Sequence, residues 1–316
     1  MAIGISVVVA MLSGCSTSPA TTSGRTALRF QSSWENDAEF MGYYLAVDKG
    51  YYKDAGLDVT YTSGGPAVIP ESTLLAGTAD IALTSPDTTI AAITGQDAPF
   101  VIIGAQYQQN PLGVVSLTKS GITGPKDLIG KTVAVPDVSR LAFDAMLTIN
   151  KIDPKTVKVV PYAYDPTPLV KGEVDATVDF VTNVPFSIEQ LGAKASSFTF
   201  FGAGFKIPTD TVVVTKDFLA KNKPALKAWL QASVKGWTEN FVDTTAYPKT
   251  LKNTWFKGNG RTIANEAWFN AAQKPLINST GGMFKMSPAS IADTVASLAA
   301  VKIIATPKMF DMSLFD

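Results

Sequence analysis

Short apolar runs alternate along the first part of the chain with longer stretches whose apolar residues recur at helical spacing. Apolar runs bounded by turn residues are typical of buried strands, and recurrence every three or four residues is typical of amphipathic helices. The alternation predicts a mostly parallel sheet with helices on its faces. The predicted elements are strand 28–30, helix 40–51, strand 57–61, helix 70–76, strand 81–83, helix 86–93 and strand 100–105.

A second series of elements follows the extended stretch 114–118. It ends at a strongly β-branched run that predicts a returning strand and at an amphipathic helix. The predicted elements are strand 130–135, helix 139–150, strands 156–161 and 174–181, strand 211–215 and helix 225–241.

Two extended crossings, near residues 114 and 211, are what a hinged protein of two lobes requires. The pattern therefore predicts an α/β protein in which each lobe is a mixed, mostly parallel sheet flanked by helices. We expect residues 28–113 and 211–316 to form lobe 1 and residues 114–210 to form lobe 2.

The N-terminus carries an apolar run, 5–12, that is too short to span a bilayer, which takes about 20 residues. It matches the apolar core of a secretory signal, although no Lys or Arg precedes it. It leads into Leu12-Ser13-Gly14-Cys15, which resembles the bacterial lipobox, where cleavage precedes a lipidated cysteine. Cys15 is the only cysteine of the chain.

These features predict a signal peptide at 1–14, lipidation of Cys15 and a flexible, Ser- and Thr-rich tether at 15–27. The protein is then exported and anchored to the outer face of the cell membrane. The alternative is a buried N-terminal strand with an incidental cysteine.

The amino-acid composition excludes several classes of function. The 316 residues are 46% hydrophobic, which suffices for a large core. Lys and Arg number 27 and Asp and Glu number 27, so no net charge favours nucleic acid. The absence of histidine excludes Ser-His-Asp and Cys-His catalysis and His-ligated metal sites. We therefore expect a binding protein with no catalytic residues, metal or cofactor.

Several segments, taken in order, resemble the periplasmic binding proteins of the type II fold. The resemblance is to the group that handles thiamine pyrimidine precursors, riboflavin, alkanesulfonates and nitrate for ABC transporters. Its most specific block contains Lys49-Gly50-Tyr51-Tyr52 and Gly56-Leu57-Asp58-Val59. The further segments are Gly64-Gly65-Pro66, 75–87, Tyr107-Gln108-Gln109-Asn110-Pro111, 127–135 and 172–176.

The resemblance implies that two lobes close on a small molecule and that a membrane permease docks on the closed form. It also implies a monomer. At Asn183-Val184-Pro185 the chain departs from many relatives, which carry an acidic residue between the Asn and the Pro.

Ligand contacts in such folds come from loops at the carboxyl ends of strands. In lobe 1, Trp34 follows the first strand and offers a face for stacking on a flat heterocycle. The other lobe 1 candidates are polar or aromatic residues after strands or at helix starts. They are Asn36, Glu39, Ser85, Tyr107 and Gln108. The alternatives are lobe packing for Trp34, a helix charge for Glu39, an N-cap for Ser85 and hinge packing for Tyr107.

In lobe 2, Ser139 opens a helix, and Asp179 and Asn183 follow a buried strand. A buried Asp needs a partner, so Asp179 meets either a ligand or a turn. Arg140 is the one Arg expected near the cleft, where it holds an anion or lies in solvent. Asp210, before the returning strand, is a weaker candidate.

The balance of these residues favours an uncharged or amino-bearing aromatic heterocycle over an anion, because sulfonate and nitrate sites need clustered donors. The resemblance points to a thiamine pyrimidine precursor or riboflavin. The alternatives are an alkanesulfonate or nitrate, or an enzyme or sensory protein on the same fold.

Overall fold

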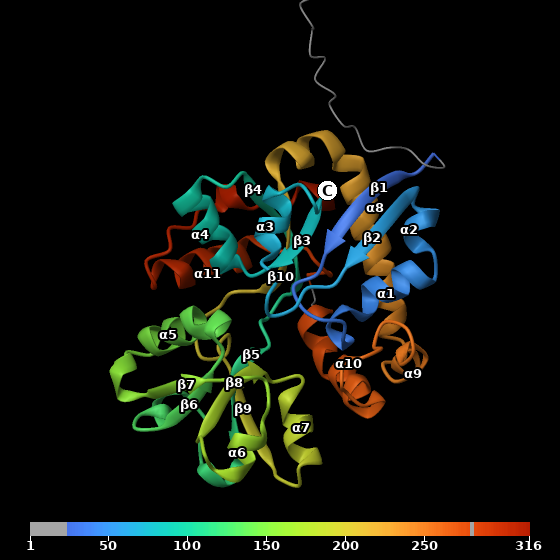
Figure 1. Cartoon of the computed structure of the whole chain (residues 1–316). Coiled ribbons are helices and arrows are strands. Elements are labelled where there is room, and N and C mark those ends of the chain that lie inside the picture. The colour runs from blue at the N-terminus through green and yellow to red at the C-terminus, as the bar shows by residue number, and fades with distance from the viewer. Residues whose placement is uncertain (1–23, 279–280) are drawn as a thin grey trace, which may run out of the picture.

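The structure, a computed structural model, describes residues 24–278 and 281–316, whose strands form two five-stranded sheets, one in each lobe (Figure 1). The expected signal peptide, Cys15 and most of the expected tether lie outside these residues. Within the described chain, no helix combines the length and hydrophobicity needed to cross a bilayer. The two-lobed α/β fold predicted from the sequence is confirmed.

The sheet of lobe 1 has the order β2-β1-β3-β10-β4. β1 pairs in parallel with β2 and β3, whereas β10 lies antiparallel between β3 and β4. The last strand of the sheet in sequence is therefore nearly central in space. The strands are β1 (Thr26–Gln31), β2 (Leu57–Thr62), β3 (Ile81–Thr84), β4 (Phe100–Tyr107) and β10 (Thr209–Thr215).

Side chains of successive β10 residues point to opposite faces of this sheet, and both faces are apolar. Val212 and Val214 belong to a core that includes Trp229, while Val213 belongs to the core on the other face with Phe310. The helices that provide these two cores are α1 (Met41–Asp48), α2 (Tyr51–Asp54) and α8 (Lys216–Asn240) on one face, and α3 (Pro70–Leu75), α4 (Pro86–Gln96) and α11 (Pro288–Ala299) on the other.

α1 and α8 pack at unusually short range because each presents a glycine to the other. A Cβ on Gly236 would lie 2.0 Å from the carbonyl oxygen of Gly42, and a Cβ on Gly42 would lie 2.2 Å from the ring of Trp237. The contact between α1 and α8 fixes the position of α1 in lobe 1. It thereby also positions the segment that precedes α1. That segment includes the short 3-10 helix η1 (Ala38–Phe40).

The sheet of lobe 2 has the order β7-β6-β8-β5-β9, with β5 antiparallel to β8 and β9 and the other pairs parallel. α5 packs on one face, and α6 and α7 pack on the other. The elements are β5 (Leu112–Leu117), β6 (Thr132–Val135), β7 (Lys158–Pro161), β8 (Ala176–Phe180), β9 (Ala195–Thr199), α5 (Arg140–Ile149), α6 (Thr167–Lys171) and α7 (Val184–Gln190).

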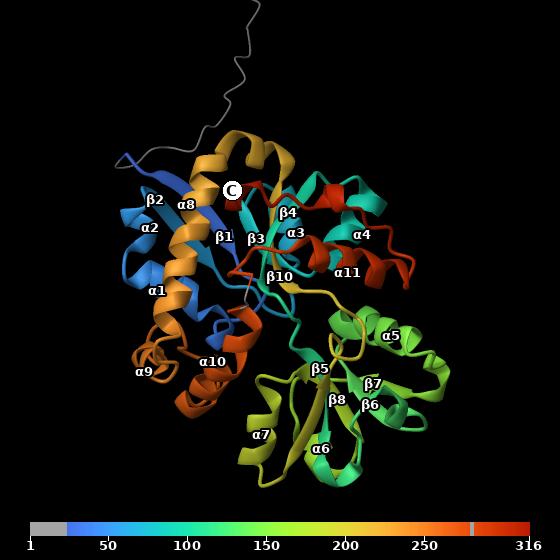
Figure 2. The same cartoon turned by 180° about the vertical axis from the view of Figure 1, so that it is seen from behind.

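The chain passes to lobe 2 between Tyr107 and Leu112 and returns between Thr199 and Thr209, as Figures 1 and 2 show from opposite sides. The return segment is apolar: Phe200, Phe205 and Ile207 are buried and join one hydrophobic core that runs through both lobes. Each crossing lies a few residues before the position expected from the sequence. The lobes are thus packed together on the hinge side.

Two details differ from the predicted elements. In place of the helix expected over 40–51 the chain forms η1, α1 and α2, and Gly50, in a left-handed conformation (φ 74°), separates α1 from α2. The sequence reading also omitted β9, α6, α7 and the helix α9 (Ala246–Leu251). α10 (Ile263–Ile277) lies against η1 in lobe 1.

The glycine contact gives a test with a matched control. Gly236→Ala should lower the free energy of unfolding by about 1–3 kcal/mol, because the added methyl meets a backbone carbonyl that cannot move alone. Gly95→Ala, in α4 with nothing within 4 Å of the added Cβ, should raise it by about 0.5–1 kcal/mol. Urea denaturation measures both, and equal effects would show that the α1–α8 contact carries no special constraint.

Candidate functional site

A cavity of about 550 Å³ lies between the two lobes. Lobe 1 contributes the loop after β1, the start of α4, the start of β10 and the segment before α10. Lobe 2 contributes the segment before α5, the end of β8 and the start of α7. Most of these segments follow the carboxyl end of a strand, which is where ligands bind in α/β folds.

Trp34 lies on the lobe 1 side of the cavity in a tightly held loop. Its carbonyl accepts hydrogen bonds from the Gly64 amide (2.9 Å) and the Ser32 hydroxyl (3.0 Å). Gly64 must be glycine, because a Cβ would lie 2.6 Å from the Ser32 carbonyl oxygen. The Trp34 ring contacts Tyr164 of lobe 2, with centroids 5.0 Å apart. The two lobes thus meet through tilted aromatic rings at the cavity.

An ion pair anchors the acidic wall of lobe 1. Arg261 Nη1 lies 2.7 Å from Asp37 Oδ2, and Asp37 Oδ1 accepts the Glu39 amide at 2.8 Å. Burial raises the pKa of Asp37, and the Arg261 guanidinium opposes this rise. Burial lowers the pKa of Arg261, but Asp37, Glu266 and Asp179 outweigh it and raise the value above its ordinary range. The guanidinium is therefore shared among several carboxyl groups.

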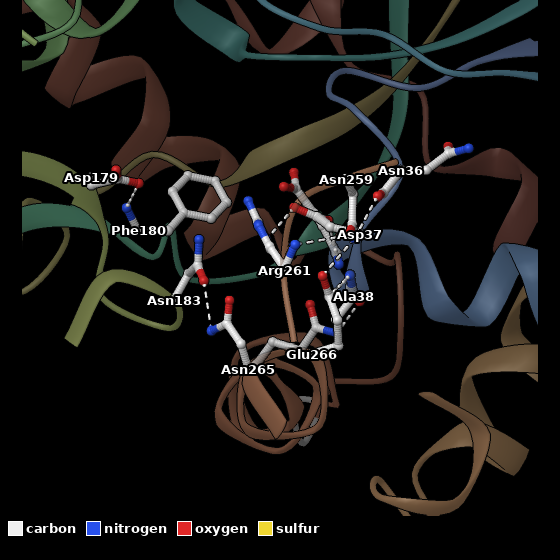
Figure 3. Close-up of polar contacts among 12 residues, drawn as sticks. Asn36, Asp37, Ala38, Asp179, Phe180, Asn183, Asn259, Arg261, Asn265 and Glu266 are labelled. Carbon is white, nitrogen blue, oxygen red and sulfur yellow. Dashed lines mark hydrogen bonds and ion pairs between the residues drawn. The ribbon is translucent and has the colours of Figure 1, made fainter. Parts of the chain in front are cut away.

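Glu266 does not line the cavity, but it holds the segment after Asp37 in place. It is fully buried on α10, accepts the Ala38 amide at 2.7 Å and accepts Asn259 Nδ2 at 2.8 Å. Burial raises its pKa to about 8, with Asp37 adding to the rise. Figure 3 shows Glu266, with its hydrogen bonds to Ala38 and Asn259, near the ion pair of Arg261 and Asp37. With its pKa raised in this way, the Glu266 carboxyl group is mostly neutral and adds little negative charge beside Asp37.

Glu39 and Asp210 form a hydrogen-bonded pair of carboxyl groups. Burial and the adjacent Asp210 raise the pKa of Glu39 well above its usual value. Burial raises the pKa of Asp210 to about 6, while Glu39 and Ser33 lower it by hydrogen bonding. Asp210 accepts Ser33 Oγ at 2.6 Å and Gln106 Nε2 at 3.2 Å. The hydrogen bond between the two groups thus favours the proton on Glu39 and the carboxylate form of Asp210.

Asp210 also holds a strained backbone position. Its φ of 48° lies in the left-handed region, which non-glycine residues rarely adopt. Tyr164, on the opposite side of the cavity, shares this feature with a φ of 59°. Both side chains therefore reach the cavity from sharp backbone turns.

In lobe 2, Asp179 lies at the end of β8 and accepts the Phe180 amide at 2.7 Å. Burial raises its pKa to about 6, while this hydrogen bond and Arg261 lower it. Asn183 Oδ1 accepts Asn265 Nδ2 of lobe 1 at 3.1 Å. Val184, where many relatives are acidic, is buried and lines the cavity. Asp179 therefore supplies the carboxyl group on this side.

Ser85 and Ser139 stand at the N-cap positions of α4 and α5, and both line the cavity. Neither hydroxyl makes a side-chain cap hydrogen bond, and the Ser85 hydroxyl hydrogen-bonds the Asp87 carboxyl group. The starts of both helices thus present a hydroxyl toward the same space.

Of the nine candidates named from the sequence, six line the cavity: Trp34, Glu39, Ser85, Ser139, Asp179 and Asn183. Asn36, Tyr107 and Gln108 do not. Asn36 accepts the Tyr44 hydroxyl at 3.3 Å, Tyr107 is fully buried and donates to Gln273 at 2.6 Å, and Gln108 donates to the Ala105 carbonyl at 2.7 Å. Each is occupied within the protein.

Arg140, the arginine expected near the cleft, does not line the cavity, and the alternative in which it lies in solvent describes it. Arg140 is about half exposed and pairs with Asp144 on its own helix at 2.9 Å. Arg261 takes that place, together with Asn259 and Asn265. Asp210, the weaker candidate, also lines the cavity. Asp37 lies far before Arg261 in the sequence. No local sequence pattern could therefore reveal this ion pair.

The sequence matches the model of a family described as NMT1/THI5 like, over residues 37–244. The chain belongs to the NMT1/THI5-like family. This membership agrees with the two lobes and with a cavity formed from both.

Three relatives illustrate the family. The riboflavin-binding protein RibY of Chloroflexus aurantiacus is 21% identical over 215 residues, 66% of this chain and 60% of that protein. The formylaminopyrimidine-binding protein of Halalkalibacterium halodurans is 24% identical over 243 residues, 74% of this chain and 73% of that protein. A 4-amino-5-hydroxymethyl-2-methylpyrimidine phosphate synthase of Legionella pneumophila is 24% identical over 161 residues, half of each chain. The relatives of this NMT1/THI5-like protein are thus mainly binding proteins.

Among solved structures, the periplasmic aliphatic sulphonate binding protein SsuA from Escherichia coli superposes with a TM-score of 0.69. It is 15% identical and the match covers 91% of both chains. At this identity the likeness shows the fold, which is that of the periplasmic binding proteins.

Asp179 predicts a pH-dependent change in stability. Its folded-state pKa, raised from 3.8 to about 6, destabilises the ligand-free fold as pH rises from about 4 to 6. Asp179→Asn should therefore raise the free energy of unfolding by about 2 kcal/mol at pH 8 and by little below pH 4.

Asp127→Asn is the control of opposite sign. Hydrogen bonds from the Thr123 and Gly124 amides lower the pKa of Asp127, so its loss should destabilise the protein at pH 8. Urea denaturation across pH 4–8 measures both, and a stability loss in Asp179→Asn at pH 8 would contradict the assignment.

Proposed function

We propose that this protein is an extracytoplasmic solute-binding protein of an ABC importer. In this proposal it captures a small aromatic heterocycle with amino or ring N–H donors in the cavity between its lobes and delivers it to a membrane permease. Export, lipidation at Cys15 and a monomeric state belong to the same proposal. The observation that carries it is the excess of carboxyl groups over cations on the cavity walls.

Five carboxyl groups line the cavity, against a single arginine. Arg261 is already paired with Asp37. Within the described residues, Asp179 and Asp210 make no ion pair with a Lys or Arg, so both retain acceptor capacity. Desolvating an anion beside them is costly, whereas a ligand with N–H donors satisfies them.

The size and the aromatic lining fit the same ligand class. A volume of about 550 Å³ lies within the range of pockets for small molecules. Trp34 and Tyr164 provide aromatic rings from opposite lobes at the cavity wall, and such rings can pack against a flat ligand. The riboflavin-binding and formylaminopyrimidine-binding relatives support this class.

An alkanesulfonate is the second candidate. The N-termini of α4 and α5 lie at the cavity, each with a serine hydroxyl, Ser85 and Ser139. Arg261 also lines the cavity. Such groups together can hold an anion. The neighbouring carboxylates oppose this reading.

Catalysis is not part of the proposal, although one relative is named a synthase. The chain has no histidine, and the cavity carboxyl groups of Asp37, Asp179 and Asp210 each accept at least one hydrogen bond from the protein. Binding and release require only that the lobes open and close.

The proposal is tested by titrating the full chain with hydroxymethylpyrimidine, formylaminopyrimidine, riboflavin and an alkanesulfonate while following tryptophan fluorescence. We expect saturable quenching by a heterocycle. Trp34→Ala should weaken that binding by about tenfold to a hundredfold, the usual loss when a stacking ring is removed. Trp34→Phe keeps a ring face and should retain most of the affinity.

Each other result has a defined meaning. Saturation only by the sulfonate would reverse the ligand class and favour the second candidate. No binding to any compound of the panel would refute the proposed ligand classes. Binding that is unchanged in Trp34→Ala would remove Trp34 from the site.

A further inference from the structure

Beside the cavity, the two lobes also touch through a pair of helices. α10 of lobe 1 and α7 of lobe 2 contact each other, and Figures 1 and 2 show them facing one another across the gap between the lobes. This contact is on the side away from the packed return segment. It therefore lies where opening of the lobes separates the surfaces most.

Two contacts between the lobes lie next to each other along these helices. Asn265 donates to Asn183 at 3.1 Å, and the rings of Trp268 and Phe186 lie 5.9 Å apart at an angle of 38°. Asn265 and Trp268 of α10 are spaced by three, as are Phe186 of α7 and Asn183, the N-cap of α7, and this spacing puts each pair on one side of its helix. Asn265 and Trp268 thus form a strip on α10 that matches Asn183 and Phe186.

The two contacts differ in their relation to the cavity. Asn183 and Asn265 line it, but Phe186 and Trp268 do not. Both rings are only partly exposed while the lobes are together. Opening returns their contact area to water, which costs free energy whether or not a ligand is present.

We propose that Trp268 and Phe186 form a latch that holds the lobes together independently of the ligand and sets how fast the ligand leaves. The role in ligand release rests on the proposed function. The latch itself is a property of the two lobes and needs no ligand.

The expected kinetics follow from the two-state closure. A ligand leaves after the closed complex opens, so its dissociation rate scales with the opening equilibrium of that complex. A contact outside the cavity stabilises the closed form without touching the ligand. Removing it should speed dissociation by about two- to tenfold, the effect of losing one aromatic pair, and should not slow association.

Stopped-flow fluorescence measures dissociation, with formylaminopyrimidine as the probe. Trp268→Ala, Phe186→Ala and the double variant form a cycle, and the double variant should dissociate no faster than the faster single one. Phe218→Ala, which removes a partly buried ring from within lobe 1, is the control and should leave the rate unchanged. Unchanged rates in both single variants, or additive effects in the double variant, would overturn the latch.

Small-angle X-ray scattering of the ligand-free chain tests the latch without any ligand. Both single variants should show a larger radius of gyration than the unmodified chain and Phe218→Ala. An unchanged radius in both single variants would overturn the proposal. If no panel compound binds, the proposed function fails, but the scattering result still decides on the latch.

Discussion

The guanidinium of Arg261 is the constraint on which the cavity depends. It ion-pairs with Asp37, and its charge acts on Glu39, Asp179 and Glu266 as well. Carboxyl groups shielded from water are unfavourable unless paired, and breaking a buried ion pair by removing one partner costs about 3–5 kcal/mol. Arg261 lets acidic side chains from both lobes face one space. It also ties the segment before α10 to the loop after β1, although the two are far apart in the sequence.

The sequence pattern correctly predicts those strands whose side chains are buried on both faces of the sheet. The Val212–Val214 run reads as a strand because every residue is apolar and buried. β9 (Ala195–Thr199) escapes detection because it is a polar strand at the edge of its sheet, and edge strands need no apolar pattern. Gly50 divides a predicted helix through its backbone conformation, which apolar periodicity does not report.

The same limits apply to the cavity. Trp34, Ser85 and Asp179 follow strand ends, and topology places strand ends at the cleft. Tyr107 also ends a strand, but its hydroxyl binds Gln273 from a distant helix, and no local pattern gives that partner. Arg261 lies in a loop whose position depends on how α8 and α9 of lobe 1 direct the chain toward the cavity. Its role is therefore visible only in three dimensions.

The central place of β10 has a consequence for the order in which the molecule assembles. A chain is made from its N-terminus. The strands of lobe 2 come from one continuous stretch, so that lobe can complete its sheet as it emerges. Lobe 1 keeps a gap between β3 and β4 until β10 arrives, and Arg261 arrives later still. The cavity is thus the last part of the protein to form, and no ligand can be held before nearly the whole chain has been synthesised.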